Sequence, residues 1–225
     1  MRIFQVLMLS AAFALPGAAF ADRALVTVTG EASVEAVPDV ATLSLGVTTQ
    51  GATATEAMAA NSAQLKVVLE RLKSAGIAEG DMQTSNLSLN PNWVGYDSGA
   101  TPTIAGYTAN NMLTVRVRAL DTLGGVLDAA ITDGANTLNG LTFELAEPRP
   151  KLDEARRAAV ADAMARATLL VTAAGASLGR LVSITEAGGY VNPQPMFRAE
   201  ASSVPVAAGE IGLTASVTVV FEIEG

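Results

Sequence analysis

Residues 213–223 read LTASVTVVFEI, a stretch in which apolar and polar side chains alternate, with Val220 as the one apolar residue out of step. Successive side chains of a β-strand point to opposite faces, so this period of two predicts a long strand with one buried and one solvent-facing side. The buried side is expected to hold Leu213, Ala215, Val217, Val219, Phe221 and Ile223. An alternating strand of this length is also suited to pairing across a subunit edge.

Other parts of the chain show either the same period or the wider period of a helix. Strand patterns occupy residues 25–34, 40–47, 82–89, 111–118, 138–145 and 181–186. Helical patterns, with apolar residues three or four positions apart, occupy residues 55–75, 121–134 and 150–174. The resulting order, ββαββαβαββ, predicts an α+β fold in which helices pack on a mixed, largely antiparallel sheet.

The connections between these elements complete the expected architecture. Pro38 and Asp39 separate the first two strands with turn chemistry, so these strands are expected to form a hairpin. Residues 90–103 and 188–209 are rich in Gly, Pro and polar side chains, which predicts two long loops. No segment has the composition of a linker, and the chain after its N-terminal segment is therefore expected to form one compact unit.

The three helical segments also give predictions for single residues. Asn61 falls in the apolar stripe of the first helix, and we interpret it as a buried amide with hydrogen-bond partners. The second helix is expected to begin with Asp121 as its N-cap and to bury Ile131. In the third helix the expected buried arc is Leu152, Val160, Ala163, Met164, Ala167, Leu170 and Val171. The alanines on its other side are attributed to the high helix propensity of alanine.

The composition excludes several classes of chemistry. The chain has 225 residues, with no cysteine and no histidine. Disulfide scaffolds, zinc fingers, thiol nucleophiles, Ser-His-Asp triads and histidine-bound metals all need one of these residues. The formal net charge of −8 disfavours nucleic acid as a partner, because phosphate binding needs clustered Lys and Arg. No phosphate-binding, Gly-x-Ser-x-Gly or calcium-loop motif occurs either. We therefore expect no enzymatic activity, catalytic residue, metal site or cofactor; a serine nucleophile with Lys66, Lys73 or Lys151 as its base is the alternative.

The first 21 residues have the pattern of a cleavable signal peptide. Arg2 gives a positive start, an almost wholly apolar stretch follows, and Ala19-Phe20-Ala21 supplies the small-x-small pattern of a cleavage site. A membrane anchor is the alternative for about 20 apolar residues, but the Pro16-Gly17 pair and the Ala-x-Ala end favour a removed signal. We predict cleavage of residues 1–21, export without stable membrane insertion, and a folded domain over residues 22–225.

Several short motifs, taken in order, resemble one known family. Val26-Thr27-Val28-Thr29-Gly30-Glu31, followed by Pro38-Asp39-Val40-Ala41, resembles the opening of the SIMPL-domain family. Further matches are Leu72 to Ile77 with Asp81 to Thr84, Gly106 to Asn111, Leu123 to Asn136, Asp153 to Arg156, and Ala173 to Gly175. Their order and spacing extend the resemblance over about residues 24–224.

The resemblance implies a location, a fold and an assembly. Bacterial members resemble exported proteins described as periplasmic immunogenic proteins or oxidative-stress defence proteins. By resemblance, the chain is expected to be periplasmic, to have an α+β body with repeated β-α-β elements, and to form ring-like homo-oligomers. The family has no established catalytic residues, so the resemblance transfers no active site to this chain.

Three residues are candidates for a special role. Trp93 and Tyr96 are rare aromatic residues in the predicted loop 90–103, and an exposed aromatic pair is typical of an interaction surface; covering the loop's own underside is the alternative. Arg156 falls within the apolar arc of the third helix. We interpret Arg156 as part of a buried structural ion pair with an acidic residue of the preceding strand; an anion site is the alternative. Its replacement by alanine is then expected to destabilise the protein.

These observations favour a non-enzymatic SIMPL-domain protein that self-associates in the periplasm and is linked, by resemblance, to envelope and oxidative-stress defence. The alternative is a periplasmic small-ligand binding protein whose cleft lies beneath the two long loops. A solution mass separates the two hypotheses, because only the first requires an oligomer.

Overall fold

The structure is a computed structural model that describes residues 23–95, 101–187, 194–196 and 207–225. Its strands are β1 (Leu25–Ala36), β2 (Val40–Gly51), β3 (Met82–Val94), β4 (Thr103–Val117), β5 (Thr137–Glu144), β6 (Ser177–Glu186), β7 (Gln194–Met196) and β8 (Glu210–Glu224). Its helices are α1 (Ala54–Ser74), α2 (Leu123–Thr132) and α3 (Arg149–Ala173), with 3-10 turns at Glu79–Asp81 and Leu120–Thr122. The predicted α+β class and element order are confirmed, and the short strand β7 is added.

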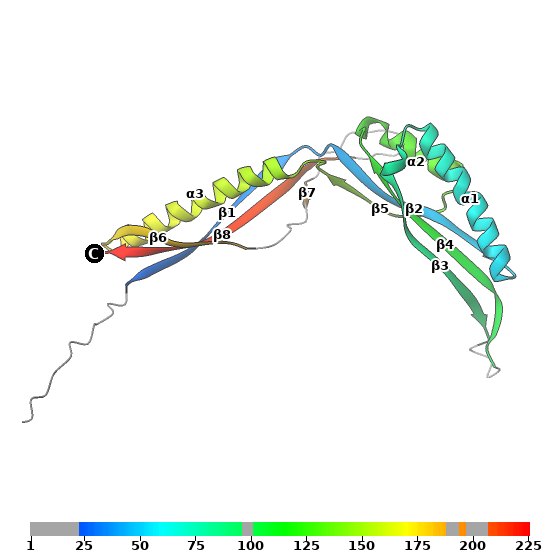
Figure 1. Ribbon diagram of the computed structural model, residues 1–225, viewed down its shortest axis with the longest axis horizontal. Coiled ribbons are helices and arrows are strands. Elements are labelled where there is room, and N and C mark those ends of the chain that lie inside the picture. The colour runs from blue at the N-terminus through cyan, green and yellow to red at the C-terminus, as the bar shows by residue number, and fades with distance from the viewer. Residues whose placement is uncertain (1–22, 96–100, 188–193, 197–206) are drawn as a thin grey trace, which may run out of the picture.

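The strands form two separate antiparallel sheets rather than one mixed sheet. The first sheet has the order β1-β8-β6, with β7 also paired to β8, and the second has the order β3-β4-β2-β5. The sheets lie end to end in an elongated, arched molecule, with the helices on the outer side of the arch (Figure 1). Each sheet has its own hydrophobic core. The chain passes between these two cores without any segment of linker composition.

β1 and β2 do not form the predicted hairpin. β1 pairs along its whole length with β8, from Leu25 opposite Glu222 to Ala36 opposite Ile211, whereas β2 pairs with β4 and β5. Asp39 instead anchors the passage from the first sheet to the second. Its backbone nitrogen donates to the carbonyl of Glu144 at 3.1 Å, and its Oδ1 accepts from the nitrogen of Ala146 at 2.7 Å. Long-range strand pairing therefore overrides the local turn signal.

β8 is the central strand of the first sheet. Leu213, Ala215, Val217, Val219 and Phe221 are buried as the period of two predicts, and Ile211 is buried with them. Ile223 was expected to be buried but is only partly so. β1 pairs along one side of β8, and β6 and β7 pair along most of the other, so β8 is an interior strand rather than an edge strand. The expectation that this strand pairs across a subunit edge is wrong.

α3 packs on the first sheet through small side chains. Its buried residues are Ala155, Ala159, Ala163, Ala167 and Val171. The predicted arc is therefore rotated, and Met164 and Leu170 are half-exposed. At Gly30 of β1 the backbones approach so closely that an added methyl group would lie 2.2 Å from the carbonyl oxygen of Ala159. Alanine thus has a packing role here in addition to its helix propensity.

The second sheet carries α1 and α2 over a core of larger side chains. This core includes Leu43, Leu45, Val47, Leu65, Val68, Leu72, Leu113, Val115, Val117, Val126 and Leu127. α1 begins with a capping box made by Thr53 and Glu56. Asn61 is fully buried beneath α1, and its Nδ2 donates to the carbonyls of Val47 at 2.8 Å and Ala109 at 3.2 Å. Its nitrogen has the predicted partners, whereas its Oδ1 has none among the described residues.

α2 begins differently from the prediction, whereas Gly134, with its positive φ of 123°, directly follows the C-cap Asp133 as the predicted stop. Asp121 is not the N-cap: it lies in the 3-10 turn that precedes the helix, and the N-cap is Thr122. Ile131 was expected to be buried but is 54% exposed. The helix turns Leu123, Val126, Leu127 and Ala130 toward the core, and Ile131 lies beside that face rather than on it.

β3 and β4 extend into the region predicted as a long loop. Asn90 pairs with Thr108, and Asn92 pairs with Gly106. Pro91 hides the strand signal, although proline is tolerated on an edge strand because its missing N–H faces solvent. In the second predicted loop, 194–196 forms β7, and most of the remaining positions lie outside the described residues.

Candidate functional site

The sheet edges differ in how they are covered. β1 and β6 are edge strands of the first sheet, and β3 and β5 are those of the second. An edge strand presents unpaired backbone N–H and C=O groups, and proteins usually block them against pairing with another chain. The edges that remain open are therefore candidate interaction surfaces.

Side chains of α3 occupy the edge of β1. Asp162 Oδ2 accepts a hydrogen bond from the nitrogen of Glu31 at 3.0 Å, and Arg166 Nη1 donates to the carbonyl of Thr29 at 3.1 Å. Asp162 and Arg166 also form an ion pair at 2.8 Å. The hydrogen bond from Glu31, with a smaller contribution from Arg166, lowers the pKa of the Asp162 carboxyl. The N–H of Glu31 and the C=O of Thr29 on the outer edge of β1 are therefore already hydrogen-bonded within the chain.

β3 has a longer open edge. Between irregularities at Thr84/Asn86 and Asn92/Trp93 its pairing with β4 is even. Leu87 and Leu89 are 54% and 39% exposed on the face that carries α1, because α1 packs over β2 and β4 and leaves β3 beyond its cover. A shallow hollow of about 460 Å³ separates α1 from β3, lined by Ala54, Thr55, Met58, Ala59, Ser62 and Leu89.

β6 is the corresponding open edge of the first sheet. Leu181 pairs with Phe221, and Ile184 pairs with Val219. Because Phe221 and Val219 belong to the core beneath α3, Leu181 and Ile184 lie on the same sheet face as α3. Each is about half-exposed, because α3 sits toward β1 and does not cover them. No other described strand pairs with the outer edge of β6.

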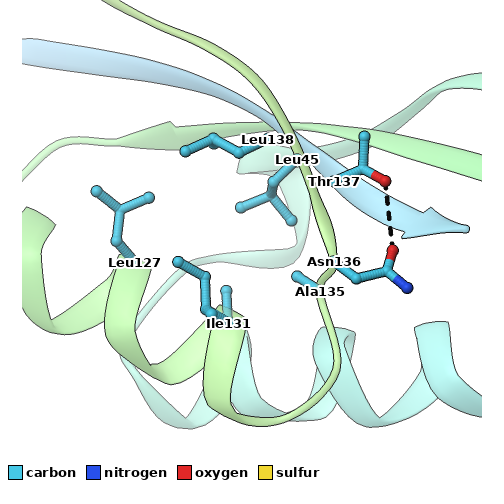
Figure 2. Close-up of a pocket in the computed structure, with 8 residues that line it drawn as sticks. Leu45, Leu127, Ile131, Ala135, Asn136, Thr137 and Leu138 are labelled. Atoms are coloured by element: carbon cyan, nitrogen blue, oxygen red, sulfur yellow. Dashed lines mark hydrogen bonds between the residues drawn. The ribbon is translucent and has the colours of Figure 1, made fainter.

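A pocket of about 180 Å³ lies between α2 and the start of β5. Its lining residues are Leu45, Leu127, Ala130, Ile131, Ala135, Asn136, Thr137 and Leu138. Figure 2 shows Leu45, Leu127, Ile131 and Leu138 converging on one space, while the side chains of Asn136 and Thr137 turn aside. Ile131 and Leu138 are half-exposed, whereas Leu45 and Leu127 are buried. The pocket therefore has a buried apolar floor and an apolar mouth.

The polar groups beside this pocket are engaged with one another. Asn136 Oδ1 accepts from the nitrogen of Thr48 at 2.7 Å, and Asn136 Nδ2 donates to the carbonyl of Thr48 at 2.8 Å. The hydroxyl of Thr137 lies 2.9 Å from that of Thr48 and donates to Asn136 Oδ1 at 3.3 Å. Asn136 thus joins the start of β5 to β2, and it offers little free hydrogen-bonding capacity to a ligand.

Arg156 forms ion pairs with two carboxylates. Its Nη1 lies 2.8 Å from Asp153 Oδ1 on the same helix, and its Nε lies 2.7 Å from Glu186 Oε1 at the end of β6. Hydrogen bonds to Glu186 and then Asp153 raise the pKa of the guanidinium group. The side chain is 40% exposed, so the expected burial is wrong, and the partner strand follows α3 rather than preceding it.

The two aromatic candidates have different outcomes. Trp93 is half-exposed, but it lies on β3 opposite Ile104 rather than in a loop, just beyond the irregularity at Asn92. Tyr96 lies outside the described residues. Trp93 is therefore one of the exposed apolar side chains of β3, together with Leu87, Leu89 and Val94.

The described residues offer no arrangement for metal binding or for spanning a membrane by a helix. Among them, no group of three or more His, Cys, Asp or Glu side chains is placed to hold a metal ion, and no helix is both long and apolar enough to cross a bilayer. The pKa of Asp81 is lowered by hydrogen bonds from Arg118, and that of Glu222 is lowered by Arg180 and Arg23. These are the shifts expected of structural ion pairs.

Sequence comparison identifies the family of this two-sheet fold. The family SIMPL, described as "Protein of unknown function (DUF541)", matches residues 26–221. The chain belongs to the SIMPL family. The predicted family membership is therefore confirmed, over both sheets and all three helices.

Curated relatives match over nearly the full chain. The 26 kDa periplasmic immunogenic protein of Brucella melitensis biotype 1 is 41% identical over 238 residues, which covers 98% of this chain and 95% of the relative. The protein of the same name from Brucella abortus (strain S19) matches to the same extent. Uncharacterized protein YggE of Escherichia coli (strain K12) is 30% identical over 233 residues, covering 98% of this chain and 94% of the relative.

The sequence interpretation missed the open edges and the pocket. Leu87 and Leu89 stand in a predicted strand, but no local pattern shows that α1 leaves that strand uncovered. Asp162 and Arg166 carry a usable signal, since an acid four residues before an arginine on one helix predicts an ion pair. The pocket brings together residues of β2, α2 and β5, which only the tertiary fold makes neighbours.

Proposed function

We propose that this SIMPL-family chain is an exported periplasmic protein without enzymatic activity that assembles head to tail. In this assembly the open edge of β3 in one copy pairs with the open edge of β6 in the next. The assembly serves in the defence of the cell envelope against oxidative stress.

The observation that carries the proposal is the contrast between the edges. Side chains of α3 form hydrogen bonds with outer backbone groups of β1. By contrast, β3 carries the exposed Leu87 and Leu89, and β6 carries the exposed Leu181 and Ile184. Edge strands with exposed aliphatic side chains favour strand addition, in which main-chain hydrogen bonds give affinity and side chains give register. β5 is less suited to this, since it has 8 residues against 13 in β3 and 10 in β6.

The shape of the molecule supports head-to-tail assembly rather than a closed pair. β3 and β6 belong to different sheets at opposite ends of the arch (Figure 1). Contact between two different surfaces repeats from copy to copy, and it yields a ring when the rotation between copies closes. An arched subunit supplies such a rotation. The periplasmic location draws on the predicted signal peptide and on the name of the Brucella relatives, and the stress role draws on the family resemblance.

The assembly is tested by measuring solution mass with edge variants. Sedimentation of the wild-type protein is expected to give a multiple of the monomer mass, and Leu87→Lys and Ile184→Lys are each expected to release monomers. Leu169→Lys on α3 is the matched control, because Leu169 is an equally aliphatic and more exposed residue away from both edges. Monomeric wild-type protein, or equal dissociation by all three variants, would contradict the proposal.

The cellular role needs a second experiment. Cells lacking the gene are expected to survive peroxide less well, and the wild-type protein should restore survival while Leu87→Lys should not. Full rescue by a variant that stays monomeric would separate stress defence from assembly and overturn that part of the proposal.

A further inference from the structure

We infer that the pocket between α2 and β5 is a binding site for a compact apolar molecule, such as a hydrocarbon ring. The site is separate from both assembly edges, and the inference is independent of the proposed assembly. None of the pocket's described lining residues belongs to the two long segments, 90–103 and 188–209, that the sequence suggested as the cover of a ligand cleft.

The volume of the pocket sets the size of the ligand. Its 180 Å³ compares with apolar cavities of about 150 Å³ that take up benzene. A single aromatic ring with one or two methyl groups fits this space, whereas a nucleotide exceeds it. The wall is formed by residues of three elements, and it is therefore fixed by the packing of α2 on the second sheet.

The hydrogen bonding around the pocket sets the chemistry of the ligand. Both functional atoms of the Asn136 amide bond to the backbone of Thr48, and the hydroxyls of Thr137 and Thr48 bond to each other. Since these groups are already paired, they provide no strong site for an ordered water and no new partner for a polar ligand. A hydroxyl group placed in the pocket would lose its hydrogen bonds to water without replacement.

The mouth of the pocket provides the route of entry and additional contact. Ile131 and Leu138 come from α2 and β5, and they expose 54% and 52% of their surface next to a buried leucine floor. A ligand seated between them would remove apolar surface of both residues from water, which favours binding. Contact with a ligand would also explain why Ile131, which is outside the core, stays half-exposed beside other apolar side chains.

The inference is tested with toluene as the probe and phenol as its polar counterpart. Saturable chemical-shift changes are expected at the methyl groups of Ile131, Leu138 and Leu127, with a toluene dissociation constant of about 1 mM or below. Phenol is expected to bind at least about tenfold more weakly. Toluene should also raise the Tm of the folded protein, because a ligand that binds only the native state stabilises it.

Two variants connect the signal to the pocket. Ile131→Trp should fill the mouth and abolish the toluene-dependent shifts, while Leu169→Trp, an exposed aliphatic position on α3, should leave them unchanged. Ala135→Leu should fill the pocket from the inside, and its fold can be checked from the remaining methyl spectrum. Absence of saturable shifts in the wild-type protein, equal affinity for phenol, or unchanged binding in both filled variants would overturn the inference.

Discussion

α3 packs on the first sheet through its alanines, which lie against Gly30 of β1, whereas α1 and α2 pack on the second sheet through leucines and valines. In the first sheet, helix and strand backbones nearly touch, so the interface depends on the absence of side-chain volume. In the second sheet, large side chains fill the space between helix and sheet, so the interface depends on their presence. Two sheets of one chain thus reach close packing by opposite means.

The two arrangements nevertheless leave the same feature exposed. Close contact with Gly30 and the hydrogen bonds of Asp162 and Arg166 hold α3 toward β1, and β6 extends beyond it. α1 packs over β2 and β4, and β3 extends beyond it. Each helix layer therefore leaves one outer strand, β6 in the first sheet and β3 in the second, with exposed aliphatic side chains. This shared feature is the basis of the proposed assembly.

Leu43→Ala should have the largest effect, because it removes a fully buried side chain from the second core. The expected loss is about 2–5 kcal/mol of unfolding free energy, from lost burial plus the cavity that remains. Urea unfolding measures the loss, and hydrogen exchange should locate it in β2, β4 and α1 while α3 and β8 keep their protection. Equal loss of protection in both sheets would show that the two cores unfold as one.

Gly30→Ala should destabilise the first sheet by adding volume rather than removing it. The new methyl group would lie 2.2 Å from the carbonyl oxygen of Ala159 and 2.4 Å from the nitrogen of Ala163. Backbone atoms cannot rotate away, so α3 must shift, at an expected cost of about 1–3 kcal/mol. Gly140→Ala on β5 is the control, since no atom lies within 4 Å of its added methyl group. An unchanged unfolding midpoint for Gly30→Ala would contradict the close contact.

Acid should weaken the cover of β1 through Asp162. Its pKa is lowered in the folded protein, so its contribution is complete above the unfolded value of about 4 and is lost as the pH falls through the folded value. Asp162→Asn should therefore show a smaller decrease in stability between about pH 5 and pH 2 than the wild-type protein. Asp128→Asn, at an exposed position of α2, is the matched control for removing one carboxylate from a helix surface. The measurement is the unfolding midpoint as a function of pH.

Arg156→Ala should have the smallest effect of these changes. The ion pairs with Asp153 and Glu186 are solvent-exposed, and exposed pairs add little to stability. The unfolding midpoint should move slightly at low salt and not at all at high salt. A large decrease in the unfolding midpoint that persists at high salt would instead support the buried ion pair expected from the sequence.

The element order was predictable because each segment carries its own period. The alternation in residues 213–223 and the helical spacing in residues 55–75 correspond to β8 and α1 within a few positions. Family membership was also predictable, since several short motifs match those of the family in the same order along the chain. These features are local in sequence, and local patterns report which face of an element is apolar.

The arrangement of the elements was less accessible. Pro38 and Asp39 form a local turn signal, but the partners of β1 and β2 lie far along the chain. The alanines of α3 fit a general preference for helix as well as a contact surface, and only Gly30 on a distant strand distinguishes the two. The open edges of β3 and β6 depend on where each helix sits across its sheet, which periodicity within one element does not specify.

Cysteine cross-linking of the two open edges tests the proposed assembly most directly. The natural chain contains no cysteine, so Asn90→Cys on β3 and Ser183→Cys on β6 introduce the only thiols. In the double variant, a bifunctional thiol reagent should give a ladder of covalent dimers, trimers and larger products that ends at the number of subunits in a closed ring. Each single variant should remain uncross-linked. Cross-linking of either single variant, or no ladder in the double variant, would contradict head-to-tail pairing of β3 with β6.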